Sequence, residues 1–286
     1  MLPNLVIIGA MKCATTSLHY YLDRHPEIAM SSQKELDFFI DKLNWKRGLD
    51  WYQSWFRSNA RIRGEASPKY TSFPLFRGVA KRMYETLPDA RLIYMVRDPL
   101  DRIISNYRFD IADGYQSLPL ATLLEDLEDN PYVVRSQYNR QVREFLRFYP
   151  LEQILIMSQE SLRSEREKSL ERVFRFLGVD PEFRCAEFEL RLLQTDLKRV
   201  HRTMSPFRVG TPIARVLERL ATTRAARLFP MGTRQSLNRI LTRPFSDPVP
   251  NAEFTDADRS RLVDILADDA NRFRALTGQP FSEWSI

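Results

Sequence analysis

The feature that most constrains this chain is residues 5–22, whose pattern predicts a buried strand, a tight loop and a helix. The first four residues are all aliphatic, as in strands covered on both faces of a parallel sheet. Gly9 then allows a tight turn, and from Thr15 the apolar residues recur with the spacing of one helical face. A helix start presents unpaired N–H groups and the positive end of a dipole. We therefore expect an anion such as phosphate to bind here.

The polar residues of this stretch favour the same interpretation. Lys12 adds a positive charge in mid-loop, and three hydroxyl-bearing residues begin the helix. The spacing differs from the nucleoside triphosphatase loop, in which Lys directly precedes the hydroxyl that binds Mg²⁺. A dinucleotide site needs several glycines, whereas Gly9 is the only glycine before Gly48. The remaining alternative is an ordinary strand and amphipathic helix with an incidental lysine.

The sequence Gly-Ala-Met-Lys-Cys-Ala-Thr-Thr-Ser-Leu resembles the 5′-phosphosulfate loop of sulfotransferases that use 3′-phosphoadenosine 5′-phosphosulfate. Further matches follow in the order of the carbohydrate and bacterial branch, which includes the heparan sulfate sulfotransferases. They are residues 25–28, 34–39, 64–70, and 97–99 with Ser105, the last resembling the 3′-phosphate motif. The resemblance implies a single α/β domain over 1–286, a P-loop-like three-layer fold with a central parallel sheet flanked by helices.

The resemblance also implies a donor site and a chemistry. A sulfuryl group would pass to an acceptor hydroxyl or amine without a metal, with Glu35 as general base and Lys12 neutralising the leaving oxygen. The residues that would bind the donor are Lys12, Cys13, Ala14, Thr15, Thr16, Ser17, Arg97, Ser105, Lys198, Arg199 and Arg202. The alternatives are a nucleotide-binding protein without turnover, and a small-molecule kinase that needs Mg²⁺ and ATP.

Glu35 is expected to have a raised pKa, because Phe38 and Phe39 would desolvate its carboxyl group. A solvated Lys–Glu pair is the alternative. His25 competes as a base, since another sulfotransferase branch uses a histidine, but it follows the first helix and lies ~15 Å from the phosphate end. His201 is the next candidate.

The heparan enzymes carry Lys where this chain has Ala66, and Lys69 is a candidate substitute. The basic run 197–202 also lacks the glycine that those enzymes show, so solvated charge is an equal alternative there.

Arg97 follows an aliphatic run at 91–96, and ligands of open α/β sheets bind at such strand ends. Asp98 suits a helix N-cap and Pro99 the first helical position, so Asp98 is read as structural rather than as a Mg²⁺ ligand. Ser105 lies ~10 Å further along that helix. Its sharing of a phosphate with Arg97 is what the resemblance implies, and a tolerated helix serine is the alternative.

Strands and helices alternate along the rest of the chain, which indicates a parallel sheet with helices on both faces. Further strands are expected at 28–30, 62–65 and 153–157, and helices at 75–87, 136–148, 161–177, 211–229 and 255–277. The aromatic segment 45–56 should form short helices, for which core packing is favoured over a platform that stacks on sugars.

The net charge of +6 is concentrated in a basic helical segment, residues 206–250. Packing against the core is the favoured role, and contact with an anionic membrane is the alternative. A nucleic-acid partner is not expected, because the chain shows no nucleic-acid-reading module.

No apolar run approaches the ~20 residues of a membrane span, so a cytoplasmic location is expected. Cys13 and Cys185 do not have disulfide or metal spacing, and three scattered His make no zinc site. Cys13 is read as a small space-filling residue whose thiol pKa could be lowered by the helix start.

Overall fold

A five-stranded sheet in the order β2-β3-β1-β4-β5 forms the centre of the molecule, and every pair of neighbouring strands is parallel. We describe a computed structural model of the chain, which covers residues 1–190, 199–201, 212, 246–249 and 252–286. The strands of this sheet are β1 (Leu5–Gly9), β2 (Ile28–Met30), β3 (Ile62–Ala66), β4 (Arg91–Val96) and β5 (Ile154–Ser158). The predicted parallel sheet is therefore confirmed.

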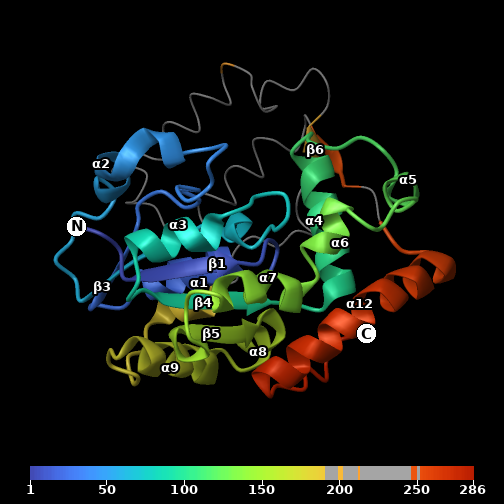
Figure 1. Cartoon of the computed structure of the whole chain (residues 1–286). Helices are drawn as coiled ribbons and strands as arrows, with labels where there is room; N and C mark the ends of the chain where they lie inside the picture. The colour runs from blue at the N-terminus through green and yellow to red at the C-terminus, as the bar shows by residue number, and fades with distance from the viewer. Residues whose placement is uncertain (191–198, 202–211, 213–245, 250–251) are drawn as a thin grey trace.

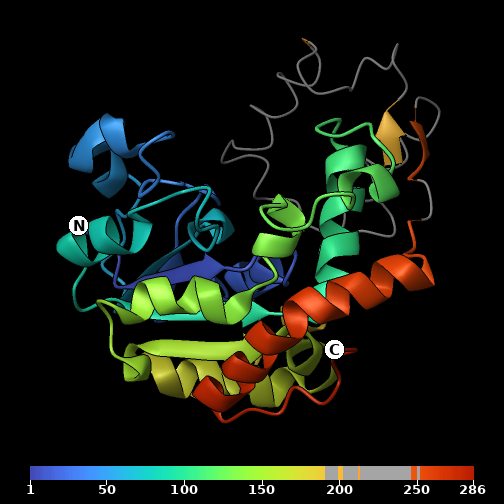
Figure 2. The ribbon, with the colours of Figure 1, turned by 45° about the vertical axis from the view of Figure 1, so that its right-hand side comes forward.

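Helices flank this sheet on both sides, and the resulting layers can be followed in Figures 1 and 2. In chain order, the helices of the first half are α1 (Thr15–Leu22), α2 (Gly48–Gln53), α3 (Val79–Thr86), α4 (Pro99–Ala112), α5 (Leu120–Leu123) and α6 (Pro131–Val134). The described helices that follow are α7 (Tyr138–Leu146), α8 (Gln159–Ser164), α9 (Arg166–Leu177) and α12 (Asp256–Thr277). Short 3-10 turns are η1 (Trp45–Arg47), η2 (Pro68–Tyr70), η3 (Leu151–Gln153) and η4 (Ala186–Glu189). The long helix α12 packs against α7 and α4.

The predicted helix ends agree with the capping residues of the structure. Asp98 accepts a hydrogen bond from the backbone N–H of Asp101 (2.9 Å), with Pro99 in the first turn of α4. Thr255 caps α12 in the same way, and Gly178 and Gly278 end α9 and α12 with positive φ. These local signals work because they depend on neighbouring residues alone.

Some boundaries differ from the predictions, for local reasons. The helix expected at 75–87 begins only at Val79, because Gly78 has φ 71° and serves as its N-cap. The helix expected at 161–177 is two helices, since Glu165 (φ −127°, ψ 55°) interrupts the helical backbone.

The basic run near residue 200 contains strand β6 (Arg199–His201), antiparallel to β7 (Ser246–Pro248), which was not predicted. Lys198, Arg202, the helix expected at 211–229 and nearly all of the basic segment 206–250 lie outside the described residues.

The aromatic segment packs as core, as favoured from its sequence. Tyr52 is fully buried and stacks on Phe38 with ring centroids 4.2 Å apart. Phe56 is buried beside it, and the three tryptophans of the segment are partly buried against the same core. This packing lies next to the segment that carries Glu35, which is three residues before Phe38 and four before Phe39 in sequence.

Candidate active site

A cleft of about 840 Å³ opens at the carboxyl edge of the sheet. Its lining includes residues that follow each of the five strands: Lys12 after β1, Glu35 after β2, Lys69 after β3, Arg97 after β4 and Gln159 after β5. Because all five strands are parallel, their carboxyl ends meet at one edge, where ligands of open α/β sheets bind. The structure thus brings Lys12, Glu35 and Arg97 to one cleft.

The loop after β1 forms one wall of the cleft. Ala14 is the N-cap of α1 and offers no capping side chain, and the lining includes the three hydroxyl-bearing residues that begin this helix, Thr15, Thr16 and Ser17. Lys12 (φ 70°) and Ala14 (φ 59°) both have left-handed backbone conformations, which non-glycine residues adopt mainly where the surrounding structure enforces them. The helix start and its hydroxyl groups therefore line the cavity, as a phosphate site requires.

Gly9 ends β1 where the backbone of this loop passes close to residues after β3. A Cβ atom at Gly9 would lie 1.9 Å from Thr71 Oγ1, far inside contact distance. Glycine is therefore required at this position by the close approach of the two segments.

Arg97, just before α4, and residues of α4 itself form a second wall of the cleft. Arg97 Nη2 donates to Asp101 Oδ2 (2.9 Å), and the hydroxyl of Tyr138 donates to the backbone carbonyl of Arg97 (2.8 Å). Ser105 is buried and also lines the cleft. Arg97 and Ser105 therefore line the same cavity, although they are separated in sequence. Lys12 Nζ lies over the ring of Phe109 from the same helix, 4.1 Å from its centroid.

Glu35 lines the other side and is held between two lysines. Lys34 Nζ lies 2.9 Å from Glu35 Oε1, and Lys69 Nζ lies 3.5 Å from Glu35 Oε2. The Glu35 side chain is still 40% exposed, so a ligand in the cleft can reach it.

The expected raised pKa of Glu35 is wrong. Burial raises it, but the ammonium groups of Lys34 and Lys69 together leave the pKa of this carboxyl below its ordinary value. The sequence interpretation counted the aromatic neighbours Phe38 and Phe39 and missed the second lysine, which comes from η2 and is distant in sequence. Glu35 is therefore an ionised carboxylate at neutral pH, ready to accept a proton.

Lys69 also joins Glu35 to a second carboxylate. Its Nζ lies 2.6 Å from Oδ2 of Asp37, whose side chain is only 7% exposed. Burial raises the pKa of Asp37 despite this ion pair. Lys69 thus places a positive charge beside the candidate base, as expected for a substitute for the lysine that is absent at Ala66.

Cys13 and His25 both have structural environments. The Cys13 side chain is fully buried, 3.8 Å from the Tyr138 hydroxyl, and burial raises the pKa of its thiol to about 12. The lowered pKa considered for Cys13 is therefore wrong, because burial outweighs any effect of the helix start. The ring of His25 is buried between Phe174 and Phe183, and its Nε2 hydrogen-bonds the carbonyl of Asp180 (3.0 Å).

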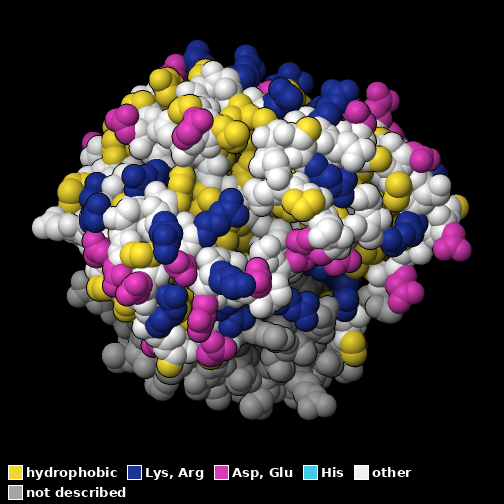
Figure 3. Space-filling model, turned by 90° about the horizontal axis from the view of Figure 1, so that it is seen from below, with side chains coloured by type: hydrophobic (Ala, Val, Ile, Leu, Met, Phe, Trp, Pro, Cys, Tyr) yellow, Lys and Arg dark blue, Asp and Glu magenta, His cyan; other side chains and the backbone are white. Residues whose placement is uncertain are grey.

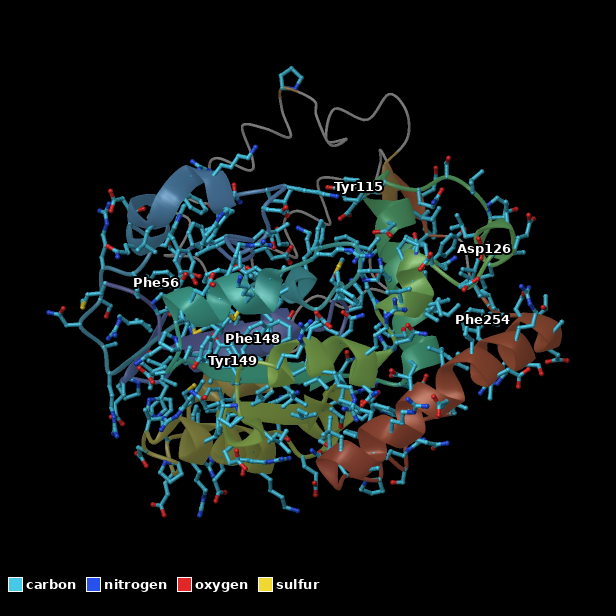
Figure 4. All side chains as sticks on the ribbon, in the orientation of Figure 1. Phe56, Tyr115, Asp126, Phe148, Tyr149 and Phe254 are labelled. Atoms are coloured by element: carbon cyan, nitrogen blue, oxygen red, sulfur yellow. The ribbon has the colours of Figure 1, made fainter. Side chains whose placement is uncertain are left out.

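Several lining residues were not predicted. Arg108, Phe109 and Asp110 follow Ser105 on α4, and helical spacing places the first two on the Ser105 face, a signal that the sequence did contain. Arg135, Arg163 and Arg166 come from distant elements and gave no such signal. Tyr115, near the end of α4 in Figure 4, also lines the cleft and is 70% exposed.

The cleft carries a net positive charge. Among its lining residues that the structure describes, eight are Lys or Arg and three are Asp or Glu. On the face seen in Figure 3, by contrast, Lys and Arg are mixed with Asp and Glu. The cationic surplus of the cleft fits an anionic ligand.

The part of the chain that the structure describes contains no group of three or more His, Cys, Asp or Glu side chains arranged for a metal ion. Within that part, too, no helix is long and apolar enough to cross a membrane.

This fold and cleft define an α/β protein with a cationic cleft at the carboxyl ends of its parallel strands. Residues 2–201 match the family described as "Sulfotransferase domain". The chain therefore belongs to the sulfotransferase family, and its fold and enzyme class are those inferred from the sequence.

Individual relatives agree with this assignment. The chain is 41% identical over 115 residues to the membrane-associated sulfotransferase kil1 of Dictyostelium discoideum, covering 38% of this chain and 23% of that protein. It is 31% identical over 203 residues to the human bifunctional heparan sulfate N-deacetylase/N-sulfotransferase 2, covering 63% of this chain and 22% of the relative. The aligned part is thus less than a quarter of each of these relatives.

A solved structure supports the fold over the full length. A sulfotransferase from Alicyclobacillus acidocaldarius superposes with a TM-score of 0.70 at 24% identity, covering 100% of both chains.

Proposed function

We propose that this protein transfers a sulfuryl group from 3′-phosphoadenosine 5′-phosphosulfate to an acceptor hydroxyl or amine, with Glu35 as the general base. The observation that carries the proposal is the presence of Lys12 and Glu35 in one cleft of a sulfotransferase-family chain. The cationic surplus of this cleft suits a donor that bears several phosphate and sulfate charges.

In the proposed reaction, the acceptor oxygen or nitrogen attacks the sulfur atom, and the bond between sulfur and the bridging phosphate oxygen breaks. Glu35 takes the proton that the acceptor loses, and Lys12 with the start of α1 neutralises the charge on the departing 3′-phosphoadenosine 5′-phosphate. Arg97 and Ser105 would bind the 3′-phosphate. Lys198, Arg199 and Arg202 would cover the nucleotide, as the family resemblance implies.

Transfer without a metal is part of the proposal, because protein cations already line the cleft and can neutralise the leaving group. The lowered pKa of Glu35 keeps the carboxylate ionised before the acceptor binds, so it can take a proton, although the same shift makes it a weaker base.

A carbohydrate is the first acceptor class to test, because one relative is named for its action on heparan sulfate. Lipids and natural products remain further classes, since acceptor pockets vary independently of the fold. The basic segment 206–250 could contact an acceptor, an anionic membrane or the core.

The test is mass spectrometry of acceptors incubated with the protein, the donor and a metal chelator. A glucosamine-containing oligosaccharide and a pooled cell extract serve as acceptors. We expect products heavier by one sulfo group. Donor binding without any product would favour the non-catalytic alternative, and a phospho product that requires ATP and Mg²⁺ would favour the kinase.

A further inference from the structure

Glu65 is a buried carboxylate that lies outside the lining of the cleft. It belongs to β3 and is 0% exposed. Its Oε1 accepts hydrogen bonds from the hydroxyls of Tyr52 and Tyr70, each 2.8 Å long, and its Oε2 accepts one from Ser67 (2.6 Å). Burial raises the pKa of Glu65 to about 7, although these hydroxyl groups lower it. A carboxyl group in this position is costly, so a packing role alone explains it poorly.

Two of these three hydroxyls also hold the segment that carries Glu35. Ser67 Oγ accepts the backbone N–H of Asp37 (3.0 Å), and the Tyr70 hydroxyl accepts the backbone N–H of Phe38 (2.9 Å). Each hydroxyl has one proton to donate. Because each hydroxyl donates its hydrogen bond to Glu65, the lone pairs of the Ser67 and Tyr70 oxygen atoms remain available to accept from the two amides.

The segment needs such support. Glu35 has φ 63° and Asp37 has φ 48°, both in the left-handed region that non-glycine residues rarely adopt. Such conformations persist only when surrounding contacts enforce them. The Glu35 amide is itself bonded to the carbonyl of Ala66 (2.9 Å), so three contacts, at residues 35, 37 and 38, attach this segment to the end of β3 and the residues after it.

We propose that Glu65 is a positioning residue for the acceptor side of the cleft: through Ser67 and Tyr70 it fixes the backbone that presents Glu35. The expected effect of Glu65 on turnover rests on the proposed function, in which Glu35 is the general base. Its structural part concerns only residues 35–38 and the buried hydroxyl network, and can be measured without an acceptor.

Tyr70 and Tyr52 provide a matched pair of variants. Each is buried, and each donates to the same Glu65 oxygen at 2.8 Å, but only Tyr70 also accepts a loop amide. Tyr70→Phe and Tyr52→Phe therefore remove equal bonds to Glu65. Only the first removes the acceptor for Phe38, so a merely structural role of the network predicts equal effects.

The first measurement is hydrogen exchange of the backbone amides in the full chain. We expect Tyr70→Phe to speed exchange at Phe38 by about tenfold, while Tyr52→Phe changes it by less than about twofold. Equal acceleration in the two variants would overturn the proposal. Should Tyr70→Phe fail to fold, Ser67→Ala allows the same test, with hydrogen exchange measured at the Asp37 amide.

The second measurement separates turnover from donor binding. We expect Glu65→Gln and Tyr70→Phe to lower kcat by about 10- to 100-fold, with calorimetric affinity for 3′-phosphoadenosine 5′-phosphate within about twofold of the original. Tyr52→Phe should stay close to the original in both. An unchanged kcat in Tyr70→Phe would also overturn the proposal. If the unsubstituted protein shows no sulfuryl transfer, the proposed function is overturned instead. The hydrogen-exchange comparison would still decide the positioning role of Glu65.

Discussion

The two sides of the cleft differ in how their charges are balanced. On the donor side, Lys12 lies against an aromatic ring from α4, beside a helix start with uncapped N–H groups. On the acceptor side, two lysines, Lys34 and Lys69, are matched by two carboxylates, Glu35 and Asp37.

This difference indicates different tasks. A helix start without a side-chain cap offers backbone N–H groups to an anion, and Lys12 beside it adds positive charge, which suits the binding of a charged donor. Ion pairs that are already complete add little attraction for a ligand, but they hold side chains in place. We therefore propose that the side with Lys12 provides affinity for the donor and that the side with Glu35 provides geometry and proton transfer.

The sharpest test of this division is Glu35→Gln, which keeps the shape of the side chain but removes the proton acceptor. We expect kcat to fall by ~10²- to 10⁴-fold. Calorimetry should show unchanged affinity for 3′-phosphoadenosine 5′-phosphate. Turnover at the original rate with an acceptor hydroxyl would remove Glu35 from the mechanism, and His201 would be the next base to test.

Lys12→Ala should affect both turnover and binding, because Lys12 is proposed to contact both the bound donor and the leaving group. We expect kcat to fall by ~10²- to 10³-fold, together with weaker nucleotide binding. Lys81→Ala, which removes an exposed lysine paired with Glu85, is the control. Weaker nucleotide binding with full turnover at saturating donor would mean that Lys12 stabilises only the bound donor and not the transition state.

Arg97→Ala should affect the donor side only. Removing a charge-assisted contact is expected to weaken nucleotide affinity by roughly 10- to 100-fold, with little change in kcat at saturating donor. Isothermal titration with the nucleotide measures this, and Arg147→Ala, a surface arginine paired with Glu144, is the control. Unchanged affinity would refute the role of Arg97 in binding the 3′-phosphate.

The smallest expected effect is a shift of the pH profile in Lys34→Met. The base works when ionised, so turnover is lost as the pH falls through the pKa of Glu35. Lys34 lowers that pKa, and its removal should therefore move the acid limb of kcat to higher pH. Lys81→Met should leave the limb in place. An unmoved limb in Lys34→Met would mean that another group controls it.

The parts of the fold that could be predicted are those encoded by local patterns. The apolar run of β1, the cap at Asp98 and the stop at Gly278 each depend on a few consecutive residues, and each is confirmed. The break at Glu165 and the pairing of β6 with β7 were missed. Those features depend on backbone geometry and on partners dozens of residues away.

The same distinction applies to the site. Helical spacing from Ser105 already contained the signal for Arg108 and Phe109. The pKa of Glu35 is lowered first by Lys34, its neighbour in sequence, and further by Lys69, which comes 34 residues later and was not expected beside it. A charge environment is a property of the folded arrangement, so this part of the site required the structure.

The close approach of Gly9 to Thr71 limits how this enzyme could be redesigned. The loop that begins at Gly9 and the segment after β3 are packed directly against each other. A side-chain atom added at Gly9 would overlap with Thr71 unless one of the two segments moved. Exchanging residues 67–71 with those of another family member would therefore import that member's spacing around Gly9 as well. Libraries that seek new acceptors should keep Thr71 fixed, or vary it only together with the loop that begins at Gly9.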